Sequence, residues 1–216
     1  MGLFSSEYIH LFTEAKKLAF ADRAKYYADP NFSNIPVKEL ISKSYAKERA
    51  KLINMKKAAL ADEPGILESG DTIYLTAADK YGNMISLIQS NYRGMGSGMM
   101  PPGLGFMLQD RGELFSLDKS HRNALQGGKR PFHTIIPAFI TKDGKPYISF
   151  GVMGGPMQAQ GHVQMVTRLV DHKQNPQAAS DAPRWQVLGD YSISVEPGLP
   201  EDIVSSLEKR GHKISY

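Results

Sequence analysis

The chain has 216 residues, of which 41% are hydrophobic and 22% charged, a composition typical of globular rather than disordered proteins. It contains no cysteine, which excludes disulfides, cysteine-ligated metals and a cysteine nucleophile. Residues 1–71 carry 11 basic and 10 acidic side chains, and residues 72–216 carry 15 basic and 12 acidic ones. These charges form no block of like sign, so we expect no nucleic-acid partner. No apolar run is long enough to span a bilayer and no signal peptide is visible, so we expect no membrane partner, and the location is cytoplasmic only by default.

The first third of the chain is predicted to be helical. Apolar residues recur at helical spacing from Ser6, a suitable N-cap, to Asp29, and Pro30 then ends the helix. Pro36 favours the first turn of a second helix, and an alanine- and lysine-rich stretch predicts a third. The three predicted helices cover Ser6–Asp29, Val37–Ser42 and Tyr45–Ala61. Residues 62–71 are rich in turn-forming residues and are interpreted as a linker.

After the linker, the hydrophobic pattern changes from helical to strand-like. Two hairpins are predicted, with turns at residues 79–83 and 142–145, and the glycine-rich residues 94–105 between them should form a functional loop. The predicted strands are Thr72–Ala78, Met84–Gln89, Ile135–Ile140, Tyr147–Val152, Tyr191–Val195 and Lys213–Tyr216, and the predicted helices are Met157–His172, Pro176–Ala182 and Pro200–Arg210. We therefore expect an α+β fold in which helices cover antiparallel sheet.

The common catalytic and cofactor motifs are missing from the sequence. The six histidines include no i, i+4 pair with the intervening glutamate of a helical zinc site. There is neither a Gly-x-Ser-x-Gly nucleophile turn nor a phosphate-binding Walker loop. The sequence thus indicates neither a metal site nor an organic cofactor.

Thr72 stands where the linker meets the first predicted strand. A threonine hydroxyl is a weak nucleophile, but cleavage of the bond between Asp71 and Thr72 would free an α-amine with a pKa of about 8, which can serve as its base. Downstream, Gly154 and Gly155 follow a strand, and their N–H groups can approach a developing oxyanion. An edge-strand threonine and a simple Gly-Gly turn are the structural alternatives. Thr76 is the rival nucleophile, although strand alternation makes it a sheet residue.

Short motifs follow one another in a characteristic order along nearly the whole chain. In the helical part they are Leu18-Ala19-Phe20-Ala21-Asp22-Arg23, Asp29-Pro30-Asn31-Phe32 and the run Leu40–Ala46 with Arg49. From Thr72 onward they are Gln89-Ser90-Asn91-Tyr92, Gly96-Ser97-Gly98, Gly128-Lys129-Arg130-Pro131, Ile136-Pro137 and Gly154-Gly155. Their order and spacing resemble the γ-glutamyltranspeptidase family of N-terminal-nucleophile hydrolases.

This resemblance implies a four-layer αββα sandwich, of which the chain holds only part. It divides the chain into the end of a large subunit at residues 1–61, a processing linker at 62–71 and a small-subunit-like catalytic region at 72–216. Thr72 is then both the autoprocessing residue and the nucleophile, Gly154 and Gly155 form the oxyanion hole, and no cofactor is needed. The expected reaction is hydrolysis or transfer of the acyl group of a small, γ-glutamyl-like amide.

The positions that hold the substrate depart from the family pattern. Ser90 stands where the family has a threonine beside the nucleophile, and Tyr92 replaces an asparagine that holds the glutamyl group. Arg111 and Leu114 replace a glutamine and an aspartate that bind the α-amino group, and His133-Thr134 replaces a Ser-Ser pair that binds the α-carboxylate. Because Leu114 cannot pair with an ammonium and Arg111 repels one, we expect an altered acyl donor, such as a carboxylated acyl group.

The resemblance also implies that further segments accompany this chain. Family members carry a few hundred residues before the helical part and a hairpin after the position of Tyr216. We expect the missing large-subunit portion, or self-association, to cover exposed sheet edges. The alternative hypothesis is a non-catalytic fragment or subunit that complements a separate chain.

Overall fold

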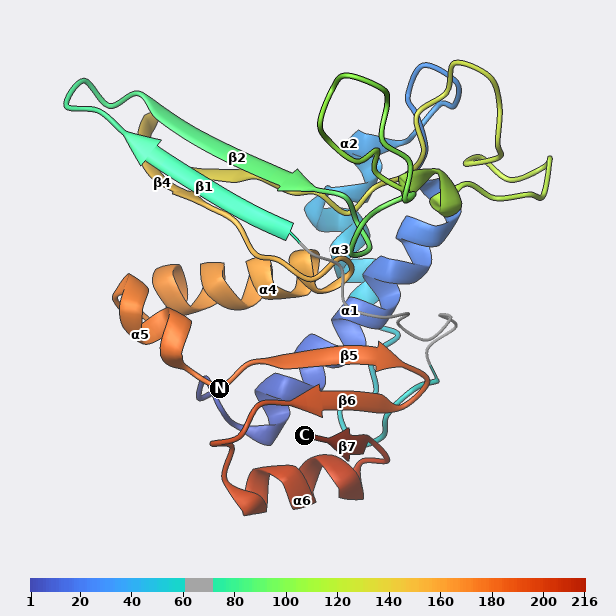
Figure 1. The fold of residues 1–216 in the computed structure, drawn as a ribbon. Coiled ribbons are helices and arrows are strands. Elements are labelled where there is room, and N and C mark those ends of the chain that lie inside the picture. The colour runs from blue at the N-terminus through green and yellow to red at the C-terminus, as the bar shows by residue number, and fades with distance from the viewer. Residues whose placement is uncertain (61–71) are drawn as a thin grey trace. The chain divides into compact units, whose positions relative to one another are not determined.

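The computed structural model describes residues 1–60 and 72–216, which belong to two compact units. Unit 1 contains the described residues 1–60, 117–130 and 164–216, and unit 2 contains residues 72–116 and 131–163. The linker predicted at 62–71 lies outside the described residues. Helices and strands are mixed along the chain, as the α+β prediction requires (Figure 1). None of the described helices combines the length and apolar character that crossing a membrane demands.

The helices at the start of unit 1 begin at local capping signals. α1 (Ser6–Tyr26) starts where predicted, but its N-cap is Ser5, whose Oγ accepts a hydrogen bond from the Tyr8 N–H at 3.2 Å. α2 (Val37–Leu40) follows Pro36, and Ser42 caps α3 (Lys43–Ala50). The prediction that the third helix continues to Ala61 was wrong, because the backbone N–H of Ala58 donates to the carbonyl oxygen of Arg210 at 2.7 Å instead of to a helical neighbour.

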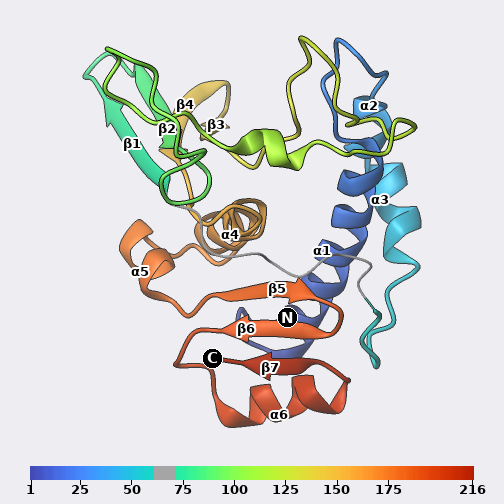
Figure 2. The same ribbon diagram turned by 45° about the vertical axis from the view of Figure 1, so that its right-hand side comes forward.

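The sheet of unit 1 comes from the last third of the chain. β5 (Trp185–Gly189) pairs antiparallel with β6 (Ser192–Val195), and β6 pairs parallel with β7 (Lys213–Ser215). α6 (Glu201–Lys209) connects the two parallel strands, while α5 (Pro176–Asp181) precedes the sheet. β5 was not predicted. In Figure 1 and Figure 2, α1 and α6 both lie beside this sheet.

One hydrophobic cluster joins α1 to the sheet and to α6. Ile9 of α1 is fully buried with Trp185, and Tyr8 and Phe12 place their rings edge-on to that indole at centroid distances of 5.9 and 5.3 Å. The remaining buried members are Ile193, Val195, Leu199, Val204 and Leu207. Because α1 precedes the predicted processing linker and the others follow it, segments from both sides of that linker build this core.

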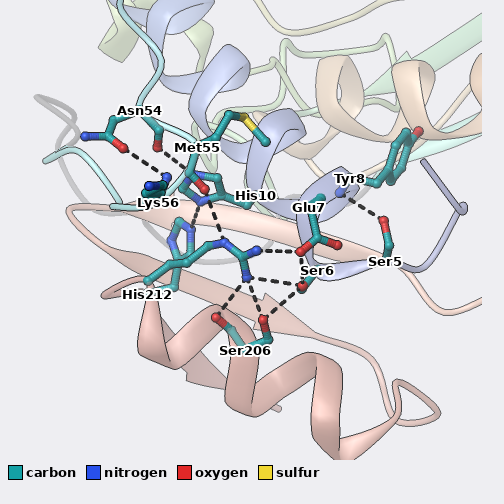
Figure 3. Close-up of polar contacts among 11 residues, drawn as sticks. Ser5, Ser6, Glu7, Tyr8, His10, Asn54, Met55, Lys56, Ser206 and His212 are labelled. Carbon is teal, nitrogen blue, oxygen red and sulfur yellow. Dashed lines mark hydrogen bonds and ion pairs between the residues drawn. The ribbon is translucent and has the colours of Figure 1, made fainter.

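A second buried face of α1 is polar. His10 Nε2 lies 2.9 Å from the carbonyl oxygen of Asn54, and His10 Nδ1 lies 2.7 Å from Nε2 of His212 (Figure 3). One turn further on, Glu14 accepts hydrogen bonds from Lys17 Nζ at 2.8 Å and from the backbone N–H of Ala59 at 3.1 Å. This face thus holds residues 54–59 against the helix.

Unit 2 contains two antiparallel hairpins, as predicted. β1 (Thr72–Ala78) pairs with β2 (Met84–Ser90), and the Asp79 carboxylate accepts the N–H groups of Tyr81 and Asn83 in the turn. β3 (Ala138–Lys142) pairs with β4 (Lys145–Phe150) through a turn with positive φ at Asp143 and Gly144. Each hairpin is a separate two-stranded sheet.

Two boundaries in this part of the chain differ from the prediction. β3 begins three residues later than Ile135, because the Ile136 N–H donates to Gln158 Oε1 at 3.0 Å and Pro137 has no N–H to offer a ladder. α4 (Met157–Val166) is shorter than predicted and changes into a π-helical turn at Thr167–Asp171. A short 3₁₀ turn, η1 (Arg111–Leu114), follows the glycine-rich loop, in which no helix or strand forms.

Candidate active site

The register of the first hairpin places Thr72 directly opposite Ser90, the first residue of β1 against the last of β2. The Thr72 hydroxyl donates to Ser90 Oγ at 3.1 Å. Thr76, the rival nucleophile, lies further along β1, where its hydroxyl donates to the carbonyl oxygen of Ile85 at 3.1 Å and also contacts the Ser149 hydroxyl. Thr76 is therefore engaged within sheet contacts, and Thr72 stands at the end of the strand beside the predicted site residues.

Arg111 connects three of the predicted site residues. Its Nη2 donates to Ser90 Oγ at 3.0 Å and its Nη1 donates to Thr134 Oγ1 at 3.1 Å. Both Arg111 and Thr134 are only 5% exposed. The backbone N–H of Arg111 donates to Gln109 Oε1 at 2.5 Å, which fixes the start of η1. Burial lowers the pKa of the Arg111 guanidinium, because a charged group loses its hydration there.

Tyr92 contacts Ser90 through its backbone and Arg111 through its ring. Its φ of 80° is unusual for a residue with a side chain, and its backbone N–H donates to Ser90 Oγ at 3.0 Å. The Arg111 guanidinium lies 4.9 Å from the centre of the Tyr92 ring, within cation–π range. Burial raises the pKa of the Tyr92 phenol, so this ring is neutral at ordinary pH.

Gly154 and Gly155 occupy backbone conformations that other residues rarely adopt, with φ of 109° and 54°. A side chain at Gly154 would lie 3.1 Å from Met157 Cβ, and one at Gly155 would lie 3.7 Å from Tyr92 Cε2. The pair therefore needs glycine, and Gly155 lies next to the ring that stacks on Arg111. Their assignment as an oxyanion hole stays a prediction.

The two residues of the predicted His133-Thr134 pair have different surroundings. Thr134 is buried and bonded to Arg111, whereas His133 is exposed. Leu114 ends η1, the turn that begins with Arg111. The structure thus brings Thr72, Ser90, Tyr92, Arg111 and Thr134 into one hydrogen-bonded and stacked cluster within unit 2.

A cavity of about 310 Å³ adjoins this cluster at Ser90. Part of its wall follows directly on the glycine-rich loop, which was expected to be functional; the individual lining residues were not predicted. Besides Ser90 the cavity is lined by Gln89, Asn91, Phe106, Met107, Leu108 and Gln109. The loop returns to β2 through the Asp110 N–H, which donates to the Asn91 carbonyl oxygen at 3.2 Å. The loop side of the cavity contributes the apolar Phe106, Met107 and Leu108, and the other lining residues are polar, so the cavity can hold both a carbon chain and a polar group of a small ligand.

The sequence model described as Gamma-glutamyltranspeptidase matches residues 1–216. The chain belongs to this family. Glutathione hydrolase-like YwrD proenzyme of Bacillus subtilis is 37% identical to it over 215 residues, which are 97% of this chain and 40% of that protein. Acylase ACY 1 proenzyme of Pseudomonas sp. strain V22 is 34% identical over 216 residues, with coverage of 99% and 38%.

A solved structure with a similar fold supports the match. Cephalosporin acylase from Bacillus halodurans superimposes with a TM-score of 0.89 and 48% sequence identity, over 98% of this chain and 38% of that one. The chain thus spans about two fifths of the length of the curated relatives that it matches. The resemblance seen in the sequence is confirmed as family membership.

Proposed function

We propose that this chain carries the nucleophile of an amide hydrolase or acyltransferase that matures by cutting its own backbone before Thr72. The observation that supports this most directly is the Thr72 hydroxyl at the start of β1, hydrogen-bonded at 3.1 Å to Ser90 in a cluster with the buried Arg111. The relatives at 37% and 34% identity are both named proenzymes, one a glutathione hydrolase-like protein and the other an acylase.

The chemistry follows from a threonine that carries a free α-amine. The amine takes the hydroxyl proton while Oγ1 of Thr72 bonds to the carbonyl carbon of the amide, giving a tetrahedral intermediate. The C–N bond then breaks, the proton passes to the leaving nitrogen, and an acyl ester remains on Thr72. Water, or an acceptor amine, attacks this ester and the Oγ1–acyl bond breaks, with the proton returned to Thr72. No step requires a metal or an organic cofactor.

Gly154 and Gly155 are proposed as the donors that stabilise the oxyanion of this intermediate. Their positive φ angles favour glycine at both positions, and at Gly154 a side chain would also crowd Met157. Backbone N–H groups that are fixed before the reaction stabilise a developing negative charge without reorganising. Gly155 adjoins the Tyr92 ring and thereby the cluster that holds Thr72.

The proposed substrates are small amides whose acyl group lacks an ammonium. Arg111 contributes a buried positive charge at Ser90, and Leu114 offers no carboxylate where a γ-glutamyl donor needs one. Thr134, Ser90 and Arg111 provide hydrogen-bond donors for a carboxylated acyl chain. His133 and Tyr92 are proposed as further residues of the substrate pocket.

The complete catalytic unit is proposed to be the four-layer αββα sandwich of the family, with residues 1–61, 62–71 and 72–216 as large-subunit end, processing linker and small-subunit-like region. The β1–β2 hairpin exposes an apolar face, on which Leu75 and Leu87 are paired and are 51% and 43% exposed. The missing large-subunit portion is the proposed cover of this face, and self-association is the alternative.

The proposal is tested by the intact mass of the purified protein and two threonine variants. The wild type should be recovered as two polypeptides divided between Asp71 and Thr72, and Thr76→Ala should behave in the same way. Thr72→Ala should remain one chain and lose amide hydrolysis by roughly a thousandfold or more, because it lacks the nucleophile.

Two outcomes would contradict the proposal. Cleavage of Thr72→Ala at the same bond would assign the cut to another protease and remove the self-processing role of Thr72. A wild-type chain that stays intact and hydrolyses no amide, even with the missing portion of the protein supplied, would favour the alternative of a non-catalytic subunit.

A further inference from the structure

Arg111 is a buried cation beside the nucleophile, and it has no anionic partner among the described residues. Its two terminal nitrogens donate to the neutral hydroxyls of Ser90 and Thr134, and its Nε has no hydrogen-bond partner there. No carboxylate in residues 1–60 or 72–216 forms an ion pair with it. An uncompensated buried charge is rare in proteins, because desolvation opposes it, and it often marks a functional site.

The carboxylates near the cluster form no ion pair with Arg111 among the described residues, although Asp110 lies near enough to favour its charged form. Glu113 pairs with Arg93 at 2.8 Å, and Asp110 accepts the backbone N–H of Arg93 at 3.3 Å. Tyr92 is neutral, because burial raises the pKa of its phenol. Among the histidines of unit 2, His133 is exposed and His162 packs against Phe150, where burial lowers its pKa and keeps it neutral.

Thr72 lies within electrostatic reach of this charge. The Thr72 hydroxyl donates to Ser90 Oγ at 3.1 Å, and Nη2 of Arg111 donates to the same oxygen at 3.0 Å. The guanidinium nitrogen is thus at most about 6 Å from Oγ1 of Thr72. The α-nitrogen is within about 3 Å of Oγ1 in the same residue, so the charge lies at most about 9 Å from it. A positive charge at about 9 Å, with an effective dielectric constant of about 20 to 40, lowers an amine's pKa by about one unit.

We propose that Arg111 keeps the α-amine of Thr72 unprotonated at neutral pH, so that it can act as the base for its own hydroxyl. The inference rests on the proposed function, since the amine exists only after the bond before Thr72 is cut. An amine of pKa about 8 is only about one tenth unprotonated at pH 7, and a decrease of one unit raises that share to about half. Arg111 acts here through its charge and through Ser90, so it is a positioning residue.

The pKa of this amine can be measured without turnover. In the processed protein, an amine-reactive acylating reagent modifies only the unprotonated amine, and mass spectrometry of the Thr72 N-terminus follows its rate against pH. We expect a wild-type pKa of about 7, and a value about one unit higher in Arg111→Gln, which keeps an N–H donor but removes the charge. Arg111→Lys keeps the charge and should stay within about half a unit of the wild type.

Arg93→Met is the matched control, because it removes a neighbouring arginine whose charge Glu113 already balances. It should leave the amine pKa within about 0.3 units of the wild type. The acid limb of kcat/KM for a glutaryl anilide, which reports the free enzyme, should move with the amine in each active variant.

Two results would overturn the inference while leaving the proposed nucleophile in place. One is an amine pKa at or above 8 in the wild type, which needs no variant and so does not depend on whether Arg111→Gln folds. The other is a folded Arg111→Gln protein whose amine titrates as in the wild type, since a merely structural arginine would give that result. Absence of a free Thr72 N-terminus would instead contradict the proposed processing.

Discussion

Leu114 and Arg111 together set the acyl-donor preference that we expect of the site. On the proposed function, a γ-glutamyl donor would bring an ammonium to a position where Leu114 has no charge and Arg111 is positive. Burying an ammonium without its anionic partner costs on the order of 3 to 5 kcal/mol of binding free energy. Each 1.4 kcal/mol corresponds to about a tenfold change in rate. We therefore predict that kcat/KM for a glutaryl anilide exceeds that for the γ-glutamyl anilide by about a hundredfold or more, measured on one preparation.

Leu114→Asp tests the cause of this preference. It should raise kcat/KM for the γ-glutamyl anilide and lower it for the glutaryl compound, because it adds a carboxylate beside the site. Leu117→Asp is the control, since Leu117 is 86% exposed and belongs to unit 1. Equal kcat/KM for the two donors in the wild type would show that another acidic group meets the ammonium.

Some site residues were predictable from the sequence, and others were not, for a physical reason. Thr72 and Ser90 face each other because a hairpin turn at residues 79–83 fixes the register of two regular strands. The bond from Arg111 to Ser90 depends on an irregular glycine-rich loop and a 3₁₀ turn, which follow no periodicity. The sequence could name Arg111 as a candidate, but its unpaired, buried state appears only in three dimensions.

At the scale of single elements, α1 was predicted from its sequence pattern, but its contacts with distant residues were not. Its length and start follow from apolar spacing and a serine cap, and the apolar Ile9 is buried as expected. Its second buried face is polar, because His10, Glu14 and Lys17 meet partners far away in the sequence. Those contacts also explain why the helix predicted at Tyr45–Ala61 ends early, since residues 54–59 bind α1.

His212, which faces α1 from the turn before β7, should make the stability of unit 1 depend on pH. Burial, and then the nearby charges of Lys17, His10 and Arg210, lowers the pKa of His212 to about 3 from its ordinary 6.5. His212 Nε2 lies 2.7 Å from His10 Nδ1, whose ring also reaches the Asn54 carbonyl oxygen through Nε2, so a buried contact would have to accommodate any proton added to His212. Glu14 offsets Lys17, and Glu7 pairs with Arg210.

The sign of the effect follows from proton uptake. Below pH 6.5 the unfolded chain binds a proton at residue 212 that the folded chain excludes, so stability is full above pH 6.5 and is lost as the pH falls toward 3. The loss approaches about 1.4 kcal/mol per pH unit for one such group. We predict that urea unfolding of Thr72→Ala, which remains one chain, shows this loss between pH 6.5 and 4.5.

A second variant assigns the acid sensitivity to His212. Adding His212→Gln should flatten the pH dependence, whereas adding His121→Asn should preserve it, because the His121 ring lies at a partly exposed contact with the Ala24 carbonyl. An unchanged slope in the His212→Gln protein would mean that other groups cause the acid sensitivity.

At the scale of the whole molecule, the apolar face of the β1–β2 hairpin should drive association of residues 1–216. The face consists of large aliphatic side chains on one side of the hairpin, exposed by between 43% and 70%: Ile73, Leu75, Ile85 and Leu87. Exposed apolar patches on strands favour contacts between molecules. We predict dimers or larger species in sedimentation velocity, increasing with concentration.

Replacing Leu75 and Leu87 by threonine should shift this equilibrium toward the monomer, because threonine suits a strand but buries little apolar area. Leu117→Thr, which changes an exposed leucine elsewhere, should have no such effect. A wild type that stays monomeric at all concentrations and unfolds in one sharp transition would contradict the prediction.

The core shared by α1, the β5–β7 sheet and α6 makes it matter whether folding precedes or follows the proposed cut before Thr72. Before any cut at residue 72, this core forms within one polypeptide, and its folding rate is independent of dilution. After the cut, the same side chains belong to two polypeptides, Ile9 to one and Trp185 to the other. Refolding then becomes a bimolecular encounter that slows as the protein is diluted. If the chain is cut as proposed, unit 1 therefore folds most readily before the cut, and a processed molecule that unfolds in dilute solution refolds more slowly than its precursor.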